Sequence, residues 1–316
     1  MTKVAIIDDY QNVALEMADW GSVDASVDVY TDHLEDEDAV AARLQGYDVV
    51  VVNRERTPFP DGLLQKLPNL KLVITNGMYN NSIDIAAANA RGITVCGSPS
   101  LGHPTPELTW GLIISLARNI PLEERNVREG RWQTSMGLSL KGRTLGIIGL
   151  GRLGRPVAQV GLAFGMEVLA WSPNLTDERA ADAGVKRAEK DDLLTKSDFI
   201  TLHMPLSDRS RGIMGAEDFA KMKPTAFLIN TSRGPLVDEA ALLGALKNGA
   251  IGGAGLDVYD HEPLPADHPI RSLPNTVLTP HLGYVTVENY EAYYPKAVES
   301  ILGWQKGAPT GVLEPK

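Results

Sequence analysis

The sequence predicts an α/β protein made of two doubly wound domains, each built on a parallel sheet. Short apolar segments alternate with helix-like segments, an order that produces parallel β-α-β units. Most of the apolar segments are continuous rather than alternating with polar residues, as expected for strands buried on both faces. The length of 316 residues is sufficient for two such domains, each with its own core.

The first hundred residues predict one small domain. Strands are expected at 3–8, 27–30, 48–53, 70–75 and 92–97. Helices are expected between them, for example at 37–46 and 82–92, and the second of these ends at Gly92, a common helix stop. This order favours a single doubly wound unit.

A Pro/Gly/Ser-rich segment, 97–106, predicts a hinge, because no helix or strand is expected to cross it intact. A helix is expected at 107–118, and the later strands at 143–151, 166–172, 199–205, 226–232, 250–259 and 275–280. A last helix, 285–305, is expected to have a kink or break at Pro295 and to return to the first domain. The predicted domains are therefore 1–99 plus 286–316, and an inserted domain, 100–285, with a cleft between them.

Composition narrows the classes of partner. The formal net charge is -10 and no Lys/Arg block is present, which argues against binding to nucleic acid or to an anionic membrane. No segment approaches the roughly 20 apolar residues of a membrane span, and the N-terminus lacks a signal-peptide pattern. The single cysteine, Cys96, cannot form an internal disulfide. We expect a cytoplasmic protein that binds small molecules.

The segment "TLGIIGLGRLGRPVAQ" carries the most specific local signal. Gly149, Gly151 and Gly154 follow an apolar strand and open a helix, the context in which this spacing binds dinucleotides. The first glycine allows a tight turn, the second lets the backbone approach a pyrophosphate, and the third lets helix and strand pack closely. Backbone N–H groups and the helix dipole then face the phosphates.

The next predicted strand ends at Ser172, where NAD sites usually place an acidic residue for the adenosine ribose. A serine removes both the carboxylate and its repulsion of a 2′-phosphate. The cofactor is therefore NAD or NADP, with a slight preference for NADP. Arg179 is the nearest cation in sequence, and a solvated helix charge is the slightly favoured account of it.

Three later segments place polar residues at the ends of predicted strands: Arg233 in "NTSRG", Asp257 and Glu262 in "GLDVYDHEP", and His281 in "TPHLGY". Open α/β sheets bind ligands at the C-terminal ends of their strands. The shared location indicates one site.

With these motifs in this order, the chain resembles the D-isomer-specific 2-hydroxyacid dehydrogenases, the family that includes phosphoglycerate, glycerate and formate dehydrogenases. The resemblance runs from "NGMYNNSIDIAAANARGITV" through the glycine turn to "PHLGY". It implies a flavodoxin-like substrate domain and a Rossmann dinucleotide-binding domain. It also implies that Arg233 binds the substrate carboxylate and carbonyl, that His281 is the acid/base, and that Glu262 pairs with His281.

The chemistry of these residue types agrees with the resemblance. Reduction of a 2-keto acid needs a hydride at the carbonyl carbon and a proton at its oxygen. A histidine titrates near neutrality, and a carboxylate neighbour favours its charged form, so His281 is expected to act as an imidazolium donor. An arginine matches a carboxylate with two parallel hydrogen bonds.

Further residues are assigned to the two binding sites, and no metal site is expected. Asp257 matches the family position that binds the nicotinamide carboxamide, although capping of nearby N–H groups would also explain an acid at a strand end. The remaining cofactor residues are Arg152, Leu153, Ser172, His203, Pro205, Thr231 and Gly283, beside the three glycines. The expected substrate residues are Arg54, Gly77, Met78, Tyr79 and Tyr284.

The substrate loop departs from the family pattern, because Tyr79 stands where a second glycine is usual and Asn81-Ser82 replace Asp-Asn. Glyoxylate or hydroxypyruvate is the first substrate to test. Two other functions stay open: a cofactor-sensing, corepressor-like binding protein on the same fold, and a formate-type dehydrogenase, which would not need the Glu262–His281 pair. The resemblance also implies a homodimer through the cofactor domains. His33 and His268 are expected to be exposed to solvent.

Overall fold

The computed structural model describes residues 1–315 and divides into two compact units. Unit 1 comprises Met1–Leu101 and the C-terminal residues from Val285 onward, and unit 2 comprises Gly102–Tyr284. Each unit contains one sheet, and all strand pairs within the two sheets are parallel. The predicted fold class, two parallel-sheet α/β domains, is confirmed.

Unit 1 has a five-stranded sheet in the order β2-β1-β3-β4-β5. Its strands are β1 (Thr2–Ile6), β2 (Ala25–Val29), β3 (Val49–Val52), β4 (Leu72–Asn76) and β5 (Thr94–Ser98). Its helices are η1 (Trp20–Ser22), α1 (Glu37–Leu44), α2 (Asp61–Gln65), α3 (Ile85–Ala90) and α11 (Val287–Gln305). Every residue of the central strands β3 and β4 is buried, which explains their uninterrupted apolar character.

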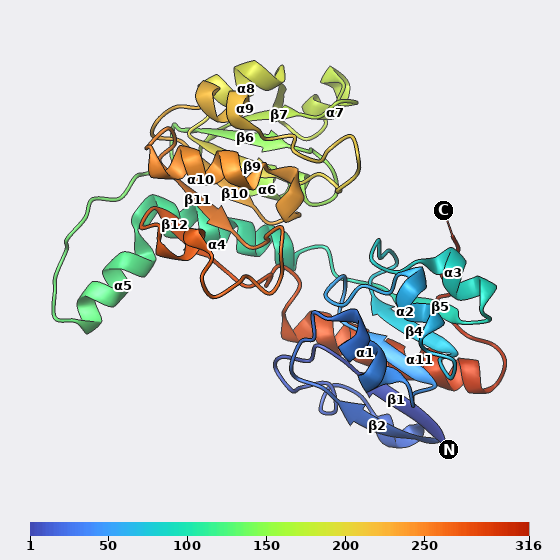
Figure 1. The fold of residues 1–316 in the computed structure, drawn as a ribbon. Helices are drawn as coiled ribbons and strands as arrows, with labels where there is room; N and C mark the ends of the chain where they lie inside the picture. Colours follow the sequence, from blue (N-terminus) through green and yellow to red (C-terminus); the bar gives the residue numbers. More distant parts are fainter. Residues whose placement is uncertain (316) are drawn as a thin grey trace. The chain divides into compact units, whose positions relative to one another are not determined.

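The C-terminal helix α11 packs on β4 and β5 of unit 1 (Figure 1). The helix continues through Pro295, so of the expected kink or break, the break is wrong. Tyr293, Tyr294 and Ala297, on either side of the proline, are fully buried. Their packing compensates for the one helical hydrogen bond that the proline cannot donate.

The C-terminal segment covers the edge of the unit 1 sheet. Gly97 donates its N–H to Gly311 O at 2.8 Å, Leu313 donates to Val95 O at 2.8 Å, and Cys96 and Val312 form an antiparallel bridge. These contacts satisfy backbone groups that an edge strand otherwise exposes.

Unit 2 has a seven-stranded sheet in the order β12-β11-β10-β9-β6-β7-β8. Its strands are β6 (Thr144–Ile148), β7 (Glu167–Trp171), β8 (Lys186–Arg187), β9 (Phe199–Leu202), β10 (Phe227–Asn230), β11 (Gly253–Leu256) and β12 (Thr276–Leu278). Its helices are α4 (Pro104–Arg118), α5 (Ile120–Arg128), α6 (Gly154–Ala163), α7 (Asp177–Ala181), α8 (Lys190–Lys196), α9 (Ala216–Lys221), α10 (Glu239–Lys247), η2 (Gly234–Leu236) and η3 (Pro269–Ser272).

The structure shortens the predicted hinge. Helix α4 begins at Pro104, so the prolines at 104 and 106 lie inside its first turn. A proline fits the first turn of a helix because the N–H groups there have no helical acceptor.

The sheet of unit 2 reverses its strand order at β6, which has β9 on one side and β7 on the other. Two apolar clusters of buried side chains fill its core, one including Leu228 and Leu242 and the other Ile147 and Ile229. In open α/β sheets, ligands bind beyond the C-terminal strand ends at such a reversal. Among the described residues, no helix combines the length and the apolar character needed to span a membrane.

Candidate active site

The strands β10, β11 and β12 lie side by side, and the loop after each carries a residue expected in the site. Oε2 of Glu262, in the loop after β11, lies 2.5 Å from Nδ1 of His281, in the loop after β12. Oε1 of the same carboxylate accepts the backbone N–H of Tyr259 at 2.8 Å. Both oxygens of Glu262 are therefore engaged, and one of them holds the histidine.

The charge state of Glu262 follows from its neighbours. Burial alone would raise the pKa of this carboxyl group, but the hydrogen bond and charge of His281 outweigh burial and hold the pKa below its usual value. The charge of Arg233 lowers this pKa further. Glu262 is therefore a carboxylate at neutral pH, the form that stabilises an imidazolium.

Asp257 fixes the turn that carries His281. His281 has a positive φ of 55°, an uncommon conformation for a residue other than glycine. Oδ1 of Asp257 accepts Oγ1 of Thr279 at 2.6 Å and the N–H of Leu282 at 2.7 Å, while Oδ2 accepts the N–H of Gly283 at 2.8 Å. Burial raises the pKa of Asp257, and these hydrogen bonds oppose the rise. The capping role considered for Asp257 in the sequence is present in the structure.

Arg233 lies three residues after the end of β10 and directly precedes η2. Its carbonyl oxygen accepts Nδ2 of Asn230 at 2.8 Å, and its Nη1 donates to the carbonyl of Ser232 at 2.6 Å. The side chain is half-buried. The ring of Tyr284 lies edge-on to that of His281, at a centroid distance of 5.7 Å. The structure thus brings His281, Glu262 and Tyr284 together.

The glycine turn has the geometry that dinucleotide binding requires. Gly149 has a φ of 103°, and a Cβ there would lie 2.7 Å from the carbonyl oxygen of His203. A Cβ on Gly154 would collide with the carbonyl oxygen of Gly149, whereas a Cβ on Gly151 would meet nothing within 4 Å. The space at Gly151 is open to a ligand. Leu153 is the residue before α6, and its side chain makes no capping hydrogen bond. Leu153 therefore leaves the first N–H groups of α6 uncapped.

His203 gives an independent sign that a polar ligand fits beside this turn. It is 8% exposed and follows β9, next to Gly149. Burial lowers its pKa to about 4, so the imidazole is neutral. Within the part of the chain that the structure describes, neither ring nitrogen has a hydrogen-bond partner. Buried polar atoms normally have partners, and a bound cofactor would supply one.

The other predicted cofactor residues lie around the same strand ends. Thr231, directly after β10, is buried and its Oγ1 lies 2.8 Å from Oγ1 of Thr109. Pro205 lies two residues after His203, and its carbonyl oxygen accepts a hydrogen bond from Oγ of Ser210 at 2.7 Å. Arg152 is exposed in the glycine turn. The carbonyl of Gly283 accepts Oγ1 of Thr105 at 2.7 Å, which joins the His281 turn to α4.

Three arginines surround the loop that follows Ser172, and the sequence singled out only Arg179. Nη1 of Arg179 donates to Asn174 O at 3.2 Å, Nη2 of Arg155 donates to Arg179 O at 3.3 Å, and Nε of Arg187 donates to Leu175 O at 3.0 Å. The acceptors are all backbone carbonyls of this region. Arg155 and Arg187 are separated from Ser172 by 17 and 15 residues, so only the packing of α6 and β8 beside β7 reveals them.

The predicted substrate residues of unit 1 lie together at the end of β4. Arg54 has a φ of 58°, and its Nη1 donates to Asn76 O at 3.2 Å. Gly77 has a φ of 106°, and a Cβ there would collide with the guanidinium of Arg54. Met78 and Tyr79 follow, with 52% and 40% of their surface exposed. Nε of Arg54 also lies 3.5 Å from Oε2 of Glu55, which offsets part of its charge.

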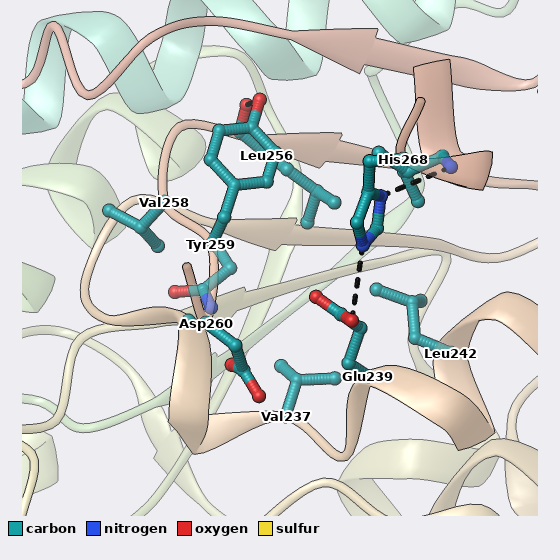
Figure 2. A pocket seen from close by; sticks show the side chains of 11 residues that line it. Val237, Glu239, Leu242, Leu256, Val258, Tyr259, Asp260 and His268 are labelled. Atoms are coloured by element: carbon teal, nitrogen blue, oxygen red, sulfur yellow. Dashed lines mark hydrogen bonds and ion pairs between the residues drawn. The ribbon is translucent and has the colours of Figure 1, made fainter. Parts of the chain in front are cut away.

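Two histidines differ from the sequence expectation of solvent exposure. His268 lines a cavity of about 20 Å³, room for about one water, and its Nε2 lies 3.1 Å from Oε1 of Glu239 (Figure 2). Nδ1 of His33 lies 2.8 Å from Oδ1 of Asp8, whose Oδ2 accepts Oγ1 of Thr57. Residues 1–315 contain no group of three or more His, Cys, Asp or Glu side chains placed to hold a metal ion.

The reversed sheet and the glycine turn define unit 2 as a dinucleotide-binding domain of the dehydrogenase type. The sequence model described as "D-isomer specific 2-hydroxyacid dehydrogenase, NAD binding domain" matches residues 110–283. The chain belongs to the D-isomer specific 2-hydroxyacid dehydrogenase family, an oxidoreductase family.

Sequence similarity to individual proteins supports this membership. The chain is 40% identical over 267 residues to a D-3-phosphoglycerate dehydrogenase of Archaeoglobus fulgidus, in an alignment that covers 83% of this chain and 50% of the relative. It is 36% identical over 257 residues to a glyoxylate reductase of Korarchaeum cryptofilum, covering 79% of this chain and 77% of the relative.

A crystal structure of a phosphoglycerate oxidoreductase from Vibrio cholerae superimposes with a TM-score of 0.92 at 37% identity, covering 98% of this chain and 100% of the other. The chain spans about half the length of the phosphoglycerate dehydrogenase relatives that it matches.

Proposed function

We propose that this protein interconverts a small 2-keto acid and a D-2-hydroxy acid with a nicotinamide cofactor. One observation carries the proposal: the 2.5 Å contact between Nδ1 of His281 and Oε2 of Glu262, at the end of two neighbouring strands. Because Nδ1 faces the carboxylate, Nε2 is the nitrogen left to donate a proton. The roles of unit 1 and unit 2 are proposed to be substrate binding and cofactor binding, respectively.

In this proposal, the chain's own residues supply orientation and a proton. The guanidinium of Arg233 binds the substrate carboxylate and polarises the carbonyl. In the reductive direction, Nε2–H of the His281 imidazolium donates its proton to the carbonyl oxygen of the substrate. Glu262 stabilises the imidazolium before this transfer. A bound nicotinamide supplies the hydride. The formate-type alternative gains no support, because formate oxidation has no use for this pair.

Asp257 is proposed to accept the carboxamide of the cofactor as well as capping the His281 turn. A carboxylate has about four acceptor positions. The chain uses three of them, for Thr279, Leu282 and Gly283. The remaining position is available to a carboxamide N–H.

We propose a preference for NADP over NAD. The support is the serine at 172 and the three arginines, Arg155, Arg179 and Arg187, that bind the carbonyls around the following loop. Guanidinium groups suit a 2′-phosphate, and the absence of an acidic side chain at Ser172 removes its repulsion.

A homodimer through unit 2 is proposed from the surface of α5 and the segment after it. Figure 1 shows α5 extending away from the sheet of its unit. Ile120, Leu122 and Val127 on α5 are exposed, and Trp132 and Met136 beyond it are 76% and 94% exposed. Apolar side chains of this size in one region are typical of an interface. A cytoplasmic location is also proposed, since the one cysteine, Cys96, is buried and unpaired.

The proposed reaction is tested with purified protein, NADPH or NADH, and a panel of 2-keto acids that includes glyoxylate and hydroxypyruvate. We expect cofactor oxidation with at least one acid. We expect His281→Ala to lower this rate by about 10² to 10⁴-fold, the usual contribution of a general acid, without changing the dissociation constant of NADPH. Tight cofactor binding without turnover on any acid would instead support the cofactor-sensing alternative.

A further inference from the structure

Tyr259 lies where the three proposed catalytic segments meet. Its backbone N–H donates to Oε1 of Glu262 at 2.8 Å, and Oε2 of the same carboxylate lies 2.5 Å from Nδ1 of His281. The main chain of Tyr259 therefore orients the carboxylate that holds the histidine.

The side chain of Tyr259 bridges the ends of two strands. Its hydroxyl lies 3.2 Å from the carbonyl oxygen of Leu256, the last residue of β11, and 3.0 Å from that of Thr279, directly after β12. Figure 2 shows its ring extending past Leu256. Burial raises the pKa of the Tyr259 hydroxyl, so it stays protonated and donates at working pH. The bridge fixes the chain two residues before His281.

The segment of Arg233 packs on the same residue. A Cβ added at Gly234 would collide with the carbonyl group of Tyr259, so the two backbones are in direct contact. Gly234 directly follows Arg233. A displacement of the Tyr259 main chain would therefore disturb the position of Arg233 as well as that of Glu262.

We propose that Tyr259 is a positioning residue for the acid/base pair: its hydroxyl sets the spacing between the loops of Glu262 and His281, and its N–H orients Glu262. The inference rests on the proposed function of the pair as the proton donor. Glu262 and His281 belong to different strands, so their contact depends on how firmly the two strand ends are joined. A contact of 2.5 Å weakens when either end slides.

Tyr259→Phe removes the hydroxyl and keeps both the ring and the backbone N–H. We expect kcat for keto-acid reduction to fall about tenfold, because small misplacements of catalytic groups are costly. We also expect the high-pH limb of the kcat profile to move to lower pH, because a looser Glu262 stabilises the imidazolium less. The dissociation constant of NADPH should not change.

Tyr293→Phe is the matched control. Tyr293 is a buried tyrosine of unit 1 whose hydroxyl donates to Val52 O at 2.9 Å. This variant loses the same kind of hydrogen bond in unit 1, whereas the three segments belong to unit 2. We expect Tyr293→Phe to keep the wild-type pH profile, whatever its effect on stability.

A second measurement does not need turnover. Contact with His281 lowers the pKa of Glu262, so carbon NMR of the Glu262 carboxyl group should titrate at higher pH in Tyr259→Phe than in wild type. An unchanged titration together with an unchanged pH profile would overturn the positioning role. If no keto acid is reduced by the wild type but the titration still moves, the positioning role stands and the proposed reaction fails.

Discussion

Oδ2 of Asp257 accepts the backbone N–H of Gly283 at 2.8 Å, which ties the end of β11 to the turn that carries His281. The other oxygen of this fully buried carboxylate accepts the N–H of Leu282 at 2.7 Å. The position of the proposed acid/base thus depends on an acid that is distant from it in sequence.

Asp257→Asn should destabilise unit 2 and lower activity together. The asparagine amide cannot accept both of the N–H groups that the carboxylate accepts, and an unsatisfied buried group costs about 1–3 kcal/mol. Urea unfolding measures this loss of free energy. The control is Asp238→Asn at the exposed start of α10, where the side chain accepts Ala241 N–H and asparagine caps equally well. A stable Asp257→Asn protein would contradict the capping role.

Glu262→Gln should move the pH dependence of reduction. The amide keeps the shape of the side chain but removes the charge that favours the imidazolium. Reduction needs the protonated histidine, so the high-pH limb of kcat should move to lower pH, and kcat at neutral pH should fall by about 10- to 100-fold. Glu239→Gln, in the second Glu–His pair of the same unit, should keep the wild-type profile. The same profile in both variants would refute the role of Glu262.

The free energy of unfolding should depend on Glu262 in a defined pH window. The pKa of Glu262 is lowered in the folded state, so its stabilisation is present above the unfolded value of about 4.3 and is lost as the pH falls through the lower folded value. Comparison of wild type with Glu262→Gln by urea unfolding should therefore show a difference at pH 6 that shrinks towards pH 3. A difference that grows as the pH falls would contradict a lowered pKa of Glu262 in the folded state.

Arg233→Lys should raise KM for the keto acid by at least about tenfold, because lysine keeps the charge but not the paired hydrogen bonds that match a carboxylate. Cofactor affinity, measured by quenching of protein fluorescence, should stay within about twofold. The control is Arg143→Lys, which alters a partly exposed ion pair with Asp198 and should leave KM for the keto acid unchanged. An unchanged KM would remove Arg233 from the substrate site.

Arg179→Ala should weaken NADPH binding by about tenfold, in proportion to the loss of one charge-assisted pair, and leave NADH binding nearly unchanged. Titration of both cofactors measures this directly. Arg91→Ala, in unit 1, should affect neither. If wild type binds NADH at least tenfold more tightly than NADPH, the proposed preference is wrong.

The pattern of apolar residues, together with the glycines and prolines that end helices and strands, was sufficient to predict most of the fold. Strands such as β3 and β4 are uninterrupted apolar segments, and burial on both faces explains why. The short strand β8 consists of Lys186 and Arg187, two charged and exposed residues without any strand pattern. Its pairing with β7 depends on the neighbour and not on its own sequence.

The sequence by itself determined the glycine turn and the order of Arg233, Glu262 and His281. The backbone of the turn requires glycines at fixed spacing, and each of the three polar residues follows an apolar strand, so both features can be recognised locally. Only the tertiary structure decided that Glu262 meets His281 at 2.5 Å, that Asp257 caps the turn that carries His281, and that Tyr259 joins the two strand ends. These contacts link residues that are up to 26 positions apart. Their geometry depends on the side-by-side pairing of β10, β11 and β12, which forms only when the whole sheet assembles.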